Sequence, residues 1–465
     1  MMRKTEGKYM KKRLRVIWMC VGMILTLTAC GLDDLFDNKD NNGVQASEKM
    51  VDKSSFYGLS ENEAVVISDM FELPDRAKKI DGEWFLSIKS VTGIDDHFYW
   101  NAAEEQMIVT TADSIAYYWP DVNNSTVNEE SVALDKPVIK LVEGKLYVSM
   151  ELVKKYTPVV LDVYEEPSRI VIWTDGSEFS TYTAKNDNVA VRISATITAD
   201  ILEKAAKGEI LYKTGEEAAG FVPVVTEDGY CGYVASEELS EGTVVNFKSE
   251  LVKKDYSHNL MEDSYFTAVW HNMIYAADGS LIKGELDGSE GVDVIIPTWY
   301  RVIDVEGNIS SNASYDYVST AHNMGMEVWG LVDDFAEGVP GIEVLSSTAS
   351  RNNLADSLVA SAIEYELDGI NVDFEYITSE SAPHYIQFLR ELYLKMKPHG
   401  LRLSVDNYVP DGSNSFYNLE AQAEVADYVM LMTYDEHYSP AGGIGSVASI
   451  GFVENGVKAA LEKVP

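Results

Sequence analysis

Cysteine is the scarcest residue of this chain, and its scarcity excludes two classes of site. Only three cysteines occur in 465 residues, and no two of them have a metal-ligand spacing. A disulfide scaffold and a paired-cysteine zinc site are therefore excluded. Cys231 stands alone in an apolar, Gly-rich strand context, which favours a small buried hydrophobe over a nucleophile.

Positive charge is also scarce. Lys and Arg together number 37 against 75 Asp and Glu, which gives a net charge of −38. Since phosphate binding needs a basic footprint, nucleic acid is excluded as a partner. Apolar residues make up 46% of the chain, which excludes a largely disordered protein, and the length predicts about three folded units.

The apolar stretch at residues 16–27 is too short to span a bilayer, and it follows a basic segment. It ends in Leu27-Thr-Ala-Cys30, which resembles the lipobox of bacterial lipoproteins. The resemblance implies that residues 1–29 are a signal peptide and that Cys30 is lipidated. The protein would then lie in the cell envelope, outside the cytoplasm, held to the membrane by lipid. A plain signal anchor with a chance cysteine is the alternative.

An internal repeat follows a polar tether. The pattern at residues 81–87 returns at 143–149, and each copy predicts a Gly turn, a strand, a short helix and two more strands. It resembles the repeat module named after the N-terminal domain of copper amine oxidases, which does not itself imply copper. His97 is the only histidine here, so a metal site of His and Cys is excluded. We interpret the region as a spacer or wall-contact unit.

A second small β unit covers residues 187–240. Its Asp228-Gly turn and the following Gly232-Tyr-Val234 resemble bacterial SH3-type domains, which often bind peptidoglycan stem peptides.

From residue 265 the pattern alternates between apolar runs of strand length and segments of helical spacing, which favours a parallel sheet and a (β/α) barrel. A doubly wound sheet is the alternative, although no Gly-rich phosphate loop follows any strand. The six candidate strands are residues 266–270, 292–297, 327–332, 369–374, 401–407 and 428–432. Since a barrel needs eight strands, we expect a C-terminal (β/α)8 TIM barrel that is apparently truncated after six units, at Pro465, by an incomplete reading frame.

The sequence thus predicts a multidomain chain. Its parts are a signal peptide at 1–29, a tether at 30–57, the repeat region at 58–176, the SH3-like domain at 187–240 and an incomplete barrel at 260–465.

The strand at residues 367–376 carries the clearest sign of chemistry. Because side chains alternate along a strand, Asn371, Asp373 and Glu375 share one face, and the apolar residues between them face the helices. Inward polar groups are costly to bury, and a structural barrel strand would carry branched apolar residues there. A helix cap would explain Glu375 alone.

Asp368-Gly-Ile-Asn-Val-Asp-Phe-Glu375 resembles the Asp-Gly-x-Asp-x-Asp-x-Glu signature of glycoside hydrolase family 18, and Met432-Thr-Tyr-Asp435 resembles its Met-x-Tyr-Asp motif. The family includes chitinases, β-N-acetylglucosaminidases and peptidoglycan-active enzymes. Residues 297–299, 404–410 and 434–438 resemble its spore-cortex and cell-wall N-acetylglucosaminidase branch.

The resemblance implies substrate-assisted retaining hydrolysis of a glycan that contains N-acetylglucosamine, with peptidoglycan as the expected substrate, without a metal or organic cofactor. Glu375 would be the general acid and then the base. Asp373 would hold the acetamido N–H, Tyr434 would steady the carbonyl end, and Asp435 would contact the sugar.

Asn371 and Met432 complete the substrate-binding set that the resemblance implies. The family usually has Asp in place of Asn371, which can hydrogen-bond Asp373 but cannot share a proton with it. Asp333, Asp334, Asp406 and Asn407 lie near strand ends without a distinguishing spacing, and Trp270 and Trp299 suit either sugar stacking or core packing.

Two alternatives to a hydrolase stay open. One is a non-catalytic glycan-binding protein on a family 18 barrel, although such relatives usually lose the acid that Glu375 retains. The other is a structural envelope protein in which the repeat and SH3-like units act.

Overall fold

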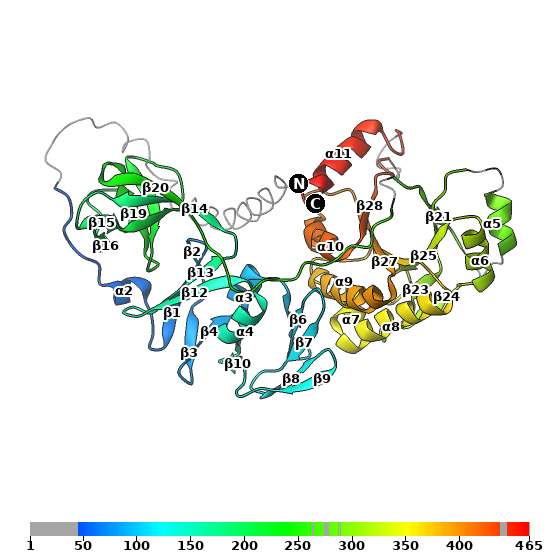
Figure 1. Ribbon diagram of the computed structural model, residues 1–465, viewed down its shortest axis with the longest axis horizontal. Coiled ribbons are helices and arrows are strands. Elements are labelled where there is room, and N and C mark those ends of the chain that lie inside the picture. Colours follow the sequence, from blue (N-terminus) through cyan, green and yellow to red (C-terminus); the bar gives the residue numbers. More distant parts are fainter. Residues whose placement is uncertain are drawn as a thin grey trace. The chain divides into compact units, whose positions relative to one another are not determined.

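The computed structural model describes residues 45–262, 265–273, 279–286, 288, 290–437 and 444–464. The predicted signal peptide, Cys30 and the first part of the tether lie outside these residues. Within them, no helix combines the length and the apolar character needed to cross a membrane. The chain folds into two compact units, which divide at Ile94/Asp95, Leu141/Val142 and Lys253/Lys254 (Figure 1).

The first unit begins with a mixed sheet of strand order β11-β4-β3-β1-β13-β12, with β2 beside β1. Three short helices accompany it: α2 (Lys53–Tyr57), α3 (Ile88–Ile94) and α4 (Met150–Tyr156). The strands are β1 (Glu63–Ser68), β2 (Phe71–Glu72), β3 (Ala77–Ile80), β4 (Glu83–Ser87), β11 (Lys145–Ser149), β12 (Val159–Tyr164) and β13 (Arg169–Thr174).

Both copies of the repeat fold into the same series of elements. The first runs β4, α3, β5 (Phe98–Asn101) and β6 (Gln106–Thr110), and the second runs β11, α4, β12 and β13. Each copy enters its first strand through a residue of positive φ followed by a glycine of positive φ, Asp81-Gly82 and Glu143-Gly144. The packing nevertheless divides the predicted repeat region between the two units, because residues 95–141 belong to the second.

The rest of the first unit is an antiparallel sheet of strand order β16-β15-β19-β18-β17-β14-β20. Its bounds, 178–246, extend past those of the predicted SH3-like domain, and that likeness stays a prediction. Burial raises the pKa of the Cys231 thiol to about 12, which agrees with a packing role. The strands are β14 (Glu178–Ala184), β15 (Val189–Arg192), β16 (Ile201–Ala205), β17 (Ile210–Lys213), β18 (Phe221–Thr226), β19 (Cys231–Ala235) and β20 (Leu239–Asn246).

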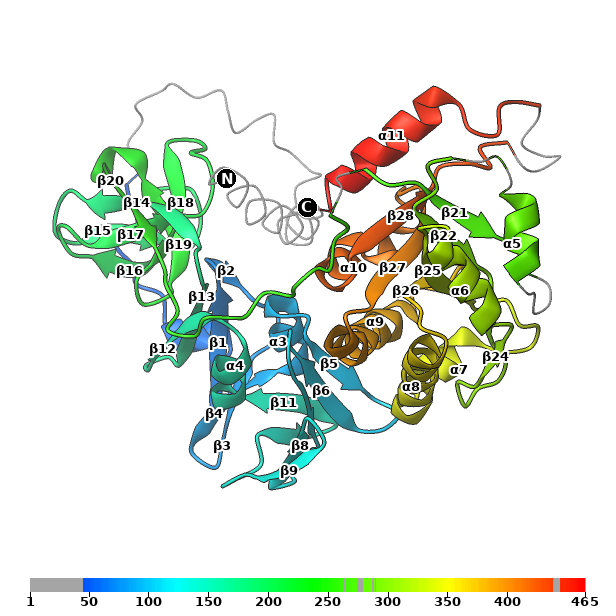
Figure 2. The same ribbon diagram turned by 45° about the vertical axis from the view of Figure 1, so that its right-hand side comes forward.

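The second unit is built on a parallel sheet whose strands neighbour one another in chain order, β21-β22-β25-β26-β27-β28. All six predicted runs form strands, and the order never reverses, as it would in a doubly wound sheet. The sheet curls as a barrel does (Figure 2). These strands are β21 (Ala268–His271), β22 (Val294–Pro297), β25 (Glu327–Asp333), β26 (Gly369–Asp373), β27 (Arg402–Tyr408) and β28 (Tyr428–Met432). The truncation stays a prediction.

Helices and one hairpin complete this layer. The hairpin of β23 (Tyr300–Val302) and β24 (Ile309–Ser311) joins the sheet through β25. The helices are α5 (Gly279–Glu285), α6 (Tyr315–Asn323), α7 (Gly341–Ser346), α8 (Thr348–Glu364), α9 (Ala382–Met396), α10 (Leu419–Val425) and α11 (Ile450–Leu461).

Helix α9 shows how the apolar spacing builds the core. It begins with Pro383 in its first turn and is followed by a turn of 3-10 helix that ends at Gly400 in the left-handed conformation. Tyr385 and Phe388 on its buried face contact the ring of Phe374, the residue after β26, and share one core cluster with Ile370 and Val372 of that strand. The predicted alternation along β26 is therefore confirmed for its apolar face.

A five-stranded antiparallel sheet, β5-β6-β7-β8-β9, belongs to the same unit. Its first strands are bonded to helices α8 and α9: Gln387 donates to Thr110 Oγ1 at 2.9 Å, and the Thr348 amide donates to Glu104 Oε1 at 2.9 Å. The first repeat copy thus supplies part of the second unit. The remaining strands are β7 (Ile115–Tyr118), β8 (Asn124–Val127) and β9 (Glu130–Ala133), while β10 (Ile139–Val142) spans the boundary between the units.

Candidate active site

The carboxyl ends of three neighbouring strands bring the predicted acidic residues together. Asp373 at the end of β26 is in register with Asp333 at the end of β25. On the other side, Val372 pairs with Val405 of β27, so Asp406 follows at the level of Asp373. Close packing of strand on strand requires Gly369, because a Cβ there would lie 2.6 Å from the Arg402 carbonyl oxygen.

Glu375 lies in the turn after β26, where its backbone is held from two sides. The two carboxylate oxygens of Asp334 accept the backbone N–H groups of Glu375 and Tyr376 at 3.0 and 3.1 Å. The Tyr417 hydroxyl donates to the Glu375 carbonyl oxygen at 2.9 Å. The Tyr408 hydroxyl donates to Glu375 Oε2, so the carboxylate has a fixed direction at the edge of the sheet.

Asn371 is fully buried, and its side-chain amide donates hydrogen bonds to the neighbouring strand, β27. Its Nδ2 donates to Ser404 Oγ at 2.9 Å and to Asp406 Oδ1 at 3.0 Å, and Trp270 Nε1 donates to its Oδ1 at 3.4 Å. The expectation that Asn371 bonds Asp373 is therefore not met: its amide is directed to Asp406. Asp373 Oδ1 is buried and has no hydrogen-bond partner among the residues that the structure describes.

The carboxyl groups that gather here outnumber the cations that the structure describes beside them. Burial, followed by the charges of Asp406 and Glu375, raises the pKa of Asp373 to about 8. Burial raises the pKa of Asp406 to about 7, against the lowering effect of its hydrogen bonds. Burial likewise raises the pKa of Asp334 to about 6. Among the described ion pairs, only Asp333 of this group has a cation, Arg301, at 2.6 and 2.9 Å.

The second predicted motif follows β28. Met432 ends that strand in register with Tyr408. Burial raises the pKa of Tyr434 to about 12, and the charges of Asp406, Asp373 and Glu375 add to the rise, so the Tyr434 hydroxyl lies within their field. Asp435 is exposed, in the left-handed conformation at φ 60°. The structure thus brings Tyr434 to the acidic group and leaves Asp435 on the loop beyond it.

Three residues of the site were not singled out by the sequence analysis. Asp334, Asp406 and Tyr408 act through contacts between strands, which spacing along one strand does not show. The sequence did contain one indication of them: Ser404, Asp406 and Tyr408 are polar residues at every second position of β27 and so share one face of the strand. The two tryptophans differ in their exposure. Trp299 is 2% exposed and lies in the core, whereas Trp270 is 46% exposed and donates a hydrogen bond to Asn371.

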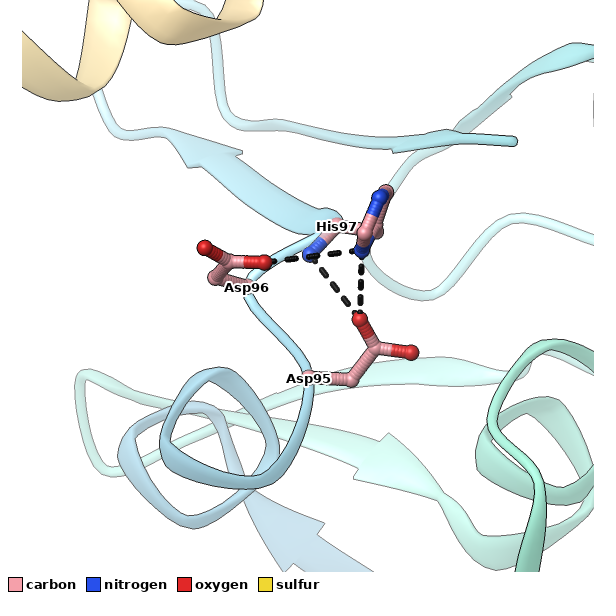
Figure 3. Close-up of side chains that lie close together, drawn as sticks. All are labelled: Asp95, Asp96 and His97. Carbon is pink, nitrogen blue, oxygen red and sulfur yellow. Dashed lines mark hydrogen bonds and ion pairs between the residues drawn. The ribbon is translucent and has the colours of Figure 1, made fainter. Parts of the chain in front are cut away.

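A second acidic group lies at the start of β5. Asp95, Asp96 and His97 form the one cluster of the described residues that is compact enough to hold a metal ion (Figure 3). His97 Nδ1 lies 2.8 Å from Asp95 and His97 Nε2 lies 3.1 Å from Glu424, while Arg390 lies 3.1 Å from Asp96. These contacts make an ion-pair network that joins β5 to helices α9 and α10.

Comparison with protein-family models finds a match over the segment that carries the site. Residues 342–463 match glycosyl hydrolases family 18. The matched segment contains Asn371, Asp373, Glu375 and Tyr434, together with Asp406.

Curated relatives agree with the family 18 match. Over 170 residues the chain is 24% identical to the uncharacterized glycosylase YvbX of Bacillus subtilis (strain 168), covering 34% of this chain and 49% of that protein. Over 129 residues it is 30% identical to the cortical fragment-lytic enzyme of the same organism, covering 26% of this chain and 30% of that protein. The chain thus spans half or less of the length of these relatives.

Among solved structures, the chain resembles a chitinase from Chromobacterium violaceum ATCC 12472. The TM-score is 0.38 and the identity 23%, over 43% of this chain and 66% of that one.

Proposed function

We propose that this protein hydrolyses β-linked N-acetylglucosamine glycans, with peptidoglycan as its substrate, by substrate-assisted retaining catalysis. The observation that carries the proposal is the placement of Glu375. It stands at the carboxyl end of a parallel strand, held by Asp334 and Tyr408, beside the buried Asp373.

In the first step, the carboxyl group of Glu375 gives its proton to the glycosidic oxygen. The acetamido carbonyl oxygen of the same sugar attacks the anomeric carbon as the C–O bond to the leaving group breaks, which forms an oxazolinium ion. Asp373, as a carboxylate, accepts a hydrogen bond from the acetamido N–H and stabilises the positive charge. The Tyr408 hydroxyl stabilises the negative charge left on Glu375.

In the second step, Glu375 takes a proton from a water molecule that attacks the anomeric carbon. The oxazolinium ring opens, the acetamido group is restored and the configuration is retained. Tyr434 steadies the acetamido carbonyl, and Met432 and Asp435 form the remaining contacts to the sugar. Asn371, which the sequence predicts in the same set, is fully buried and acts behind them through its bonds to Ser404 and Asp406. Over the cycle, Glu375 loses its proton to the leaving group and regains one from the attacking water, so the balance is the consumption of one water molecule.

Two features support peptidoglycan as the substrate. One relative is named a cortical fragment-lytic enzyme, a name that points to cell-wall glycan. The predicted lipid at Cys30 would hold the hydrolase on the outer side of the membrane, and the predicted SH3-like and repeat units would bring it to the wall.

The test is digestion of purified peptidoglycan, and of chitin in parallel, by the full chain and by Glu375→Gln. We expect new reducing ends on N-acetylglucosamine with the unchanged protein and a loss of about 10²–10⁴-fold in the variant. Glu380→Gln, an exposed residue of the same loop, is the matched control and should retain activity. Glycan binding without release by any of the three proteins would instead establish a non-catalytic glycan-binding protein.

A further inference from the structure

Asp406 is a buried carboxyl that the proposed mechanism does not use. It lies on β27 with 4% of its surface exposed, on the same face of the sheet as Ser404 and Asn371. Strand register puts it at the level of Asp373 on the neighbouring strand, one residue past the Val372–Val405 pair. A carboxyl this deeply buried would be replaced by an apolar residue if packing alone mattered here.

The groups around Asp406 include no described cation. Asn371 of β26 donates to Asp406 at 3.0 Å, and the Trp270 indole of β21 also lowers its pKa by hydrogen bonding. The titratable groups that face it are Asp373 and Glu375 from β26 and its turn, Tyr434 from the segment after β28 and Tyr385 from α9. Three carboxyl groups with neutral donors cannot all be ionised near neutral pH, so at least one proton stays among them.

Asn371 itself cannot hold that proton, because an amide does not titrate. Its amide N–H groups donate to Ser404 and to Asp406, and not to Asp373. The carboxyl group that Asn371 contacts is therefore the one on the neighbouring strand, β27. Asp373 keeps a buried oxygen, Oδ1, with no partner in the structure. The two carboxyl groups at this point of the sheet therefore lie on adjacent strands, Asp373 on β26 and Asp406 on β27.

We propose that Asp406 is a positioning residue that takes the place of the missing carboxyl at position 371 and shares one proton with Asp373. The inference rests on the proposed function. Before the sugar binds, the proton is bonded to an Asp373 oxygen. When the acetamido N–H arrives, this O–H bond breaks, the proton bonds to a carboxylate oxygen of Asp406, and Asp373 becomes the anion that accepts the N–H. The reverse transfer follows product release, so the pair keeps one negative charge throughout.

The test exchanges the two groups. Asp406→Asn removes the second carboxyl, and Asn371→Asp combined with Asp406→Asn puts it back on β26 with the amide and carboxylate of the hydrogen bond reversed. Ser404→Ala is the matched control, because it removes the other acceptor of the Asn371 amide without changing any charge.

We expect Asp406→Asn to lower kcat for a soluble N-acetylglucosamine oligomer by about 10²-fold with little change in KM, and to move the pH profile of kcat. The exchanged double variant should recover most of kcat and the profile. Ser404→Ala should leave the midpoint of the pH profile unmoved. A double variant no better than Asp406→Asn, or a profile that Asp406→Asn does not move, would overturn the proposal.

A second measurement does not depend on turnover. In the full chain labelled with ¹³C at the aspartate carboxyl carbons, the Asp373 signal should titrate at lower pH in Asp406→Asn and return in the exchanged variant. An Asp373 midpoint that stays in place overturns the shared proton whether or not the protein hydrolyses glycan. The unchanged protein could show an Asp373 titration that depends on Asp406 and yet release no reducing ends from glycan. That result would contradict the proposed function and support the shared proton.

Discussion

Two groups of buried carboxyls in the second unit differ in what faces them. On the helical side, Glu391 accepts two bonds from Arg351, at 2.9 and 3.1 Å, with both side chains almost fully buried. At the strand ends, Asp373 and Asp406 face each other and neutral donors. The first group pairs each charge with an opposite one, and the second concentrates charges of one sign.

This difference in neighbouring charge indicates that the Arg351–Glu391 pair stabilises the fold, whereas Asp373 and Asp406 suit the chemistry of the site. A carboxylate paired as Glu391 is with Arg351 is fixed in place, which suits the joining of helix α8 to helix α9. A carboxyl among carboxyls has a raised pKa and exchanges its proton near neutral pH, which suits acid–base work. The carboxyl groups are of the same chemical kind in both places. Whether an arginine lies beside them is what separates the structural pair from the carboxyls of the site.

We expect the largest effect on stability from removing the cation of the paired group, Arg351. Arg351→Met should leave Glu391 buried without an opposite charge, bonded only to the neutral amide of Gln387, and lower the free energy of unfolding by about 3–5 kcal/mol. Urea unfolding measures the change. Adding Glu391→Gln should recover a large part of the loss, because the uncompensated charge is then gone. A loss below about 1 kcal/mol for the single variant would contradict a structural role for the pair.

The next effect concerns Asp334, whose described hydrogen bonds go to the backbone N–H groups of Glu375 and Tyr376. Asp334→Asn keeps one acceptor oxygen but turns an amide toward the second N–H, so one of the Glu375 and Tyr376 amides loses its partner. We expect a loss of about 1–3 kcal/mol in stability together with lower turnover, as the Glu375 turn loosens. Asp304→Asn, which alters a similar acceptor in an exposed turn, is the control and should affect neither.

The order of elements and the chemistry of the site could be predicted from the sequence more fully than the packing. Alternation predicted one face for Asn371, Asp373 and Glu375, because it follows from the geometry of a single strand, but the strand ends at Asp373 and Glu375 lies in the turn beyond it. The two repeat copies show the limit: they form the same elements, yet β12 and β13 stay in the first unit while β5 and β6 join the second. Partners such as Gln387 for Thr110 are chosen across long stretches of chain, so a local pattern does not reveal them.

The pH dependence of stability should separate the two groups. Because the pKa values of Asp373 and Asp406 are raised to about 8 and 7, the folded state binds more protons than the unfolded one from about pH 4 upward, and stability falls as pH rises through this window. Asp373→Asn should flatten that fall by up to about 1.4 kcal/mol per pH unit. The slope is read from urea unfolding at pH 5, 6, 7 and 8.

His97 supplies the contrast for this measurement. Burial and Arg390 lower its pKa, but the bonds to Asp95 and Glu424 outweigh them, so the net pKa lies above its ordinary 6.5. The stability that it contributes is complete below pH 6.5 and is lost as pH rises through the higher folded value. His97→Gln should therefore leave the slope between pH 5 and 6 unchanged, where Asp373→Asn flattens it. Equal slopes for both variants in that interval would remove the distinction.

The smallest effect tests whether burial, and not bond length, sets the strength of a pair. Lys254 and Asp113 lie 3.0 Å apart and Arg390 and Asp96 lie 3.1 Å apart, but Lys254 is 66% exposed and Arg390 only 2%. Water and salt screen the first pair, so Lys254→Ala should cost less than about 1 kcal/mol, and less again in 1 M salt. Arg390→Met should cost several times more, because Asp96 and Glu424 then lose a buried cation. Equal losses in urea unfolding would mean that contact distance alone ranks these pairs.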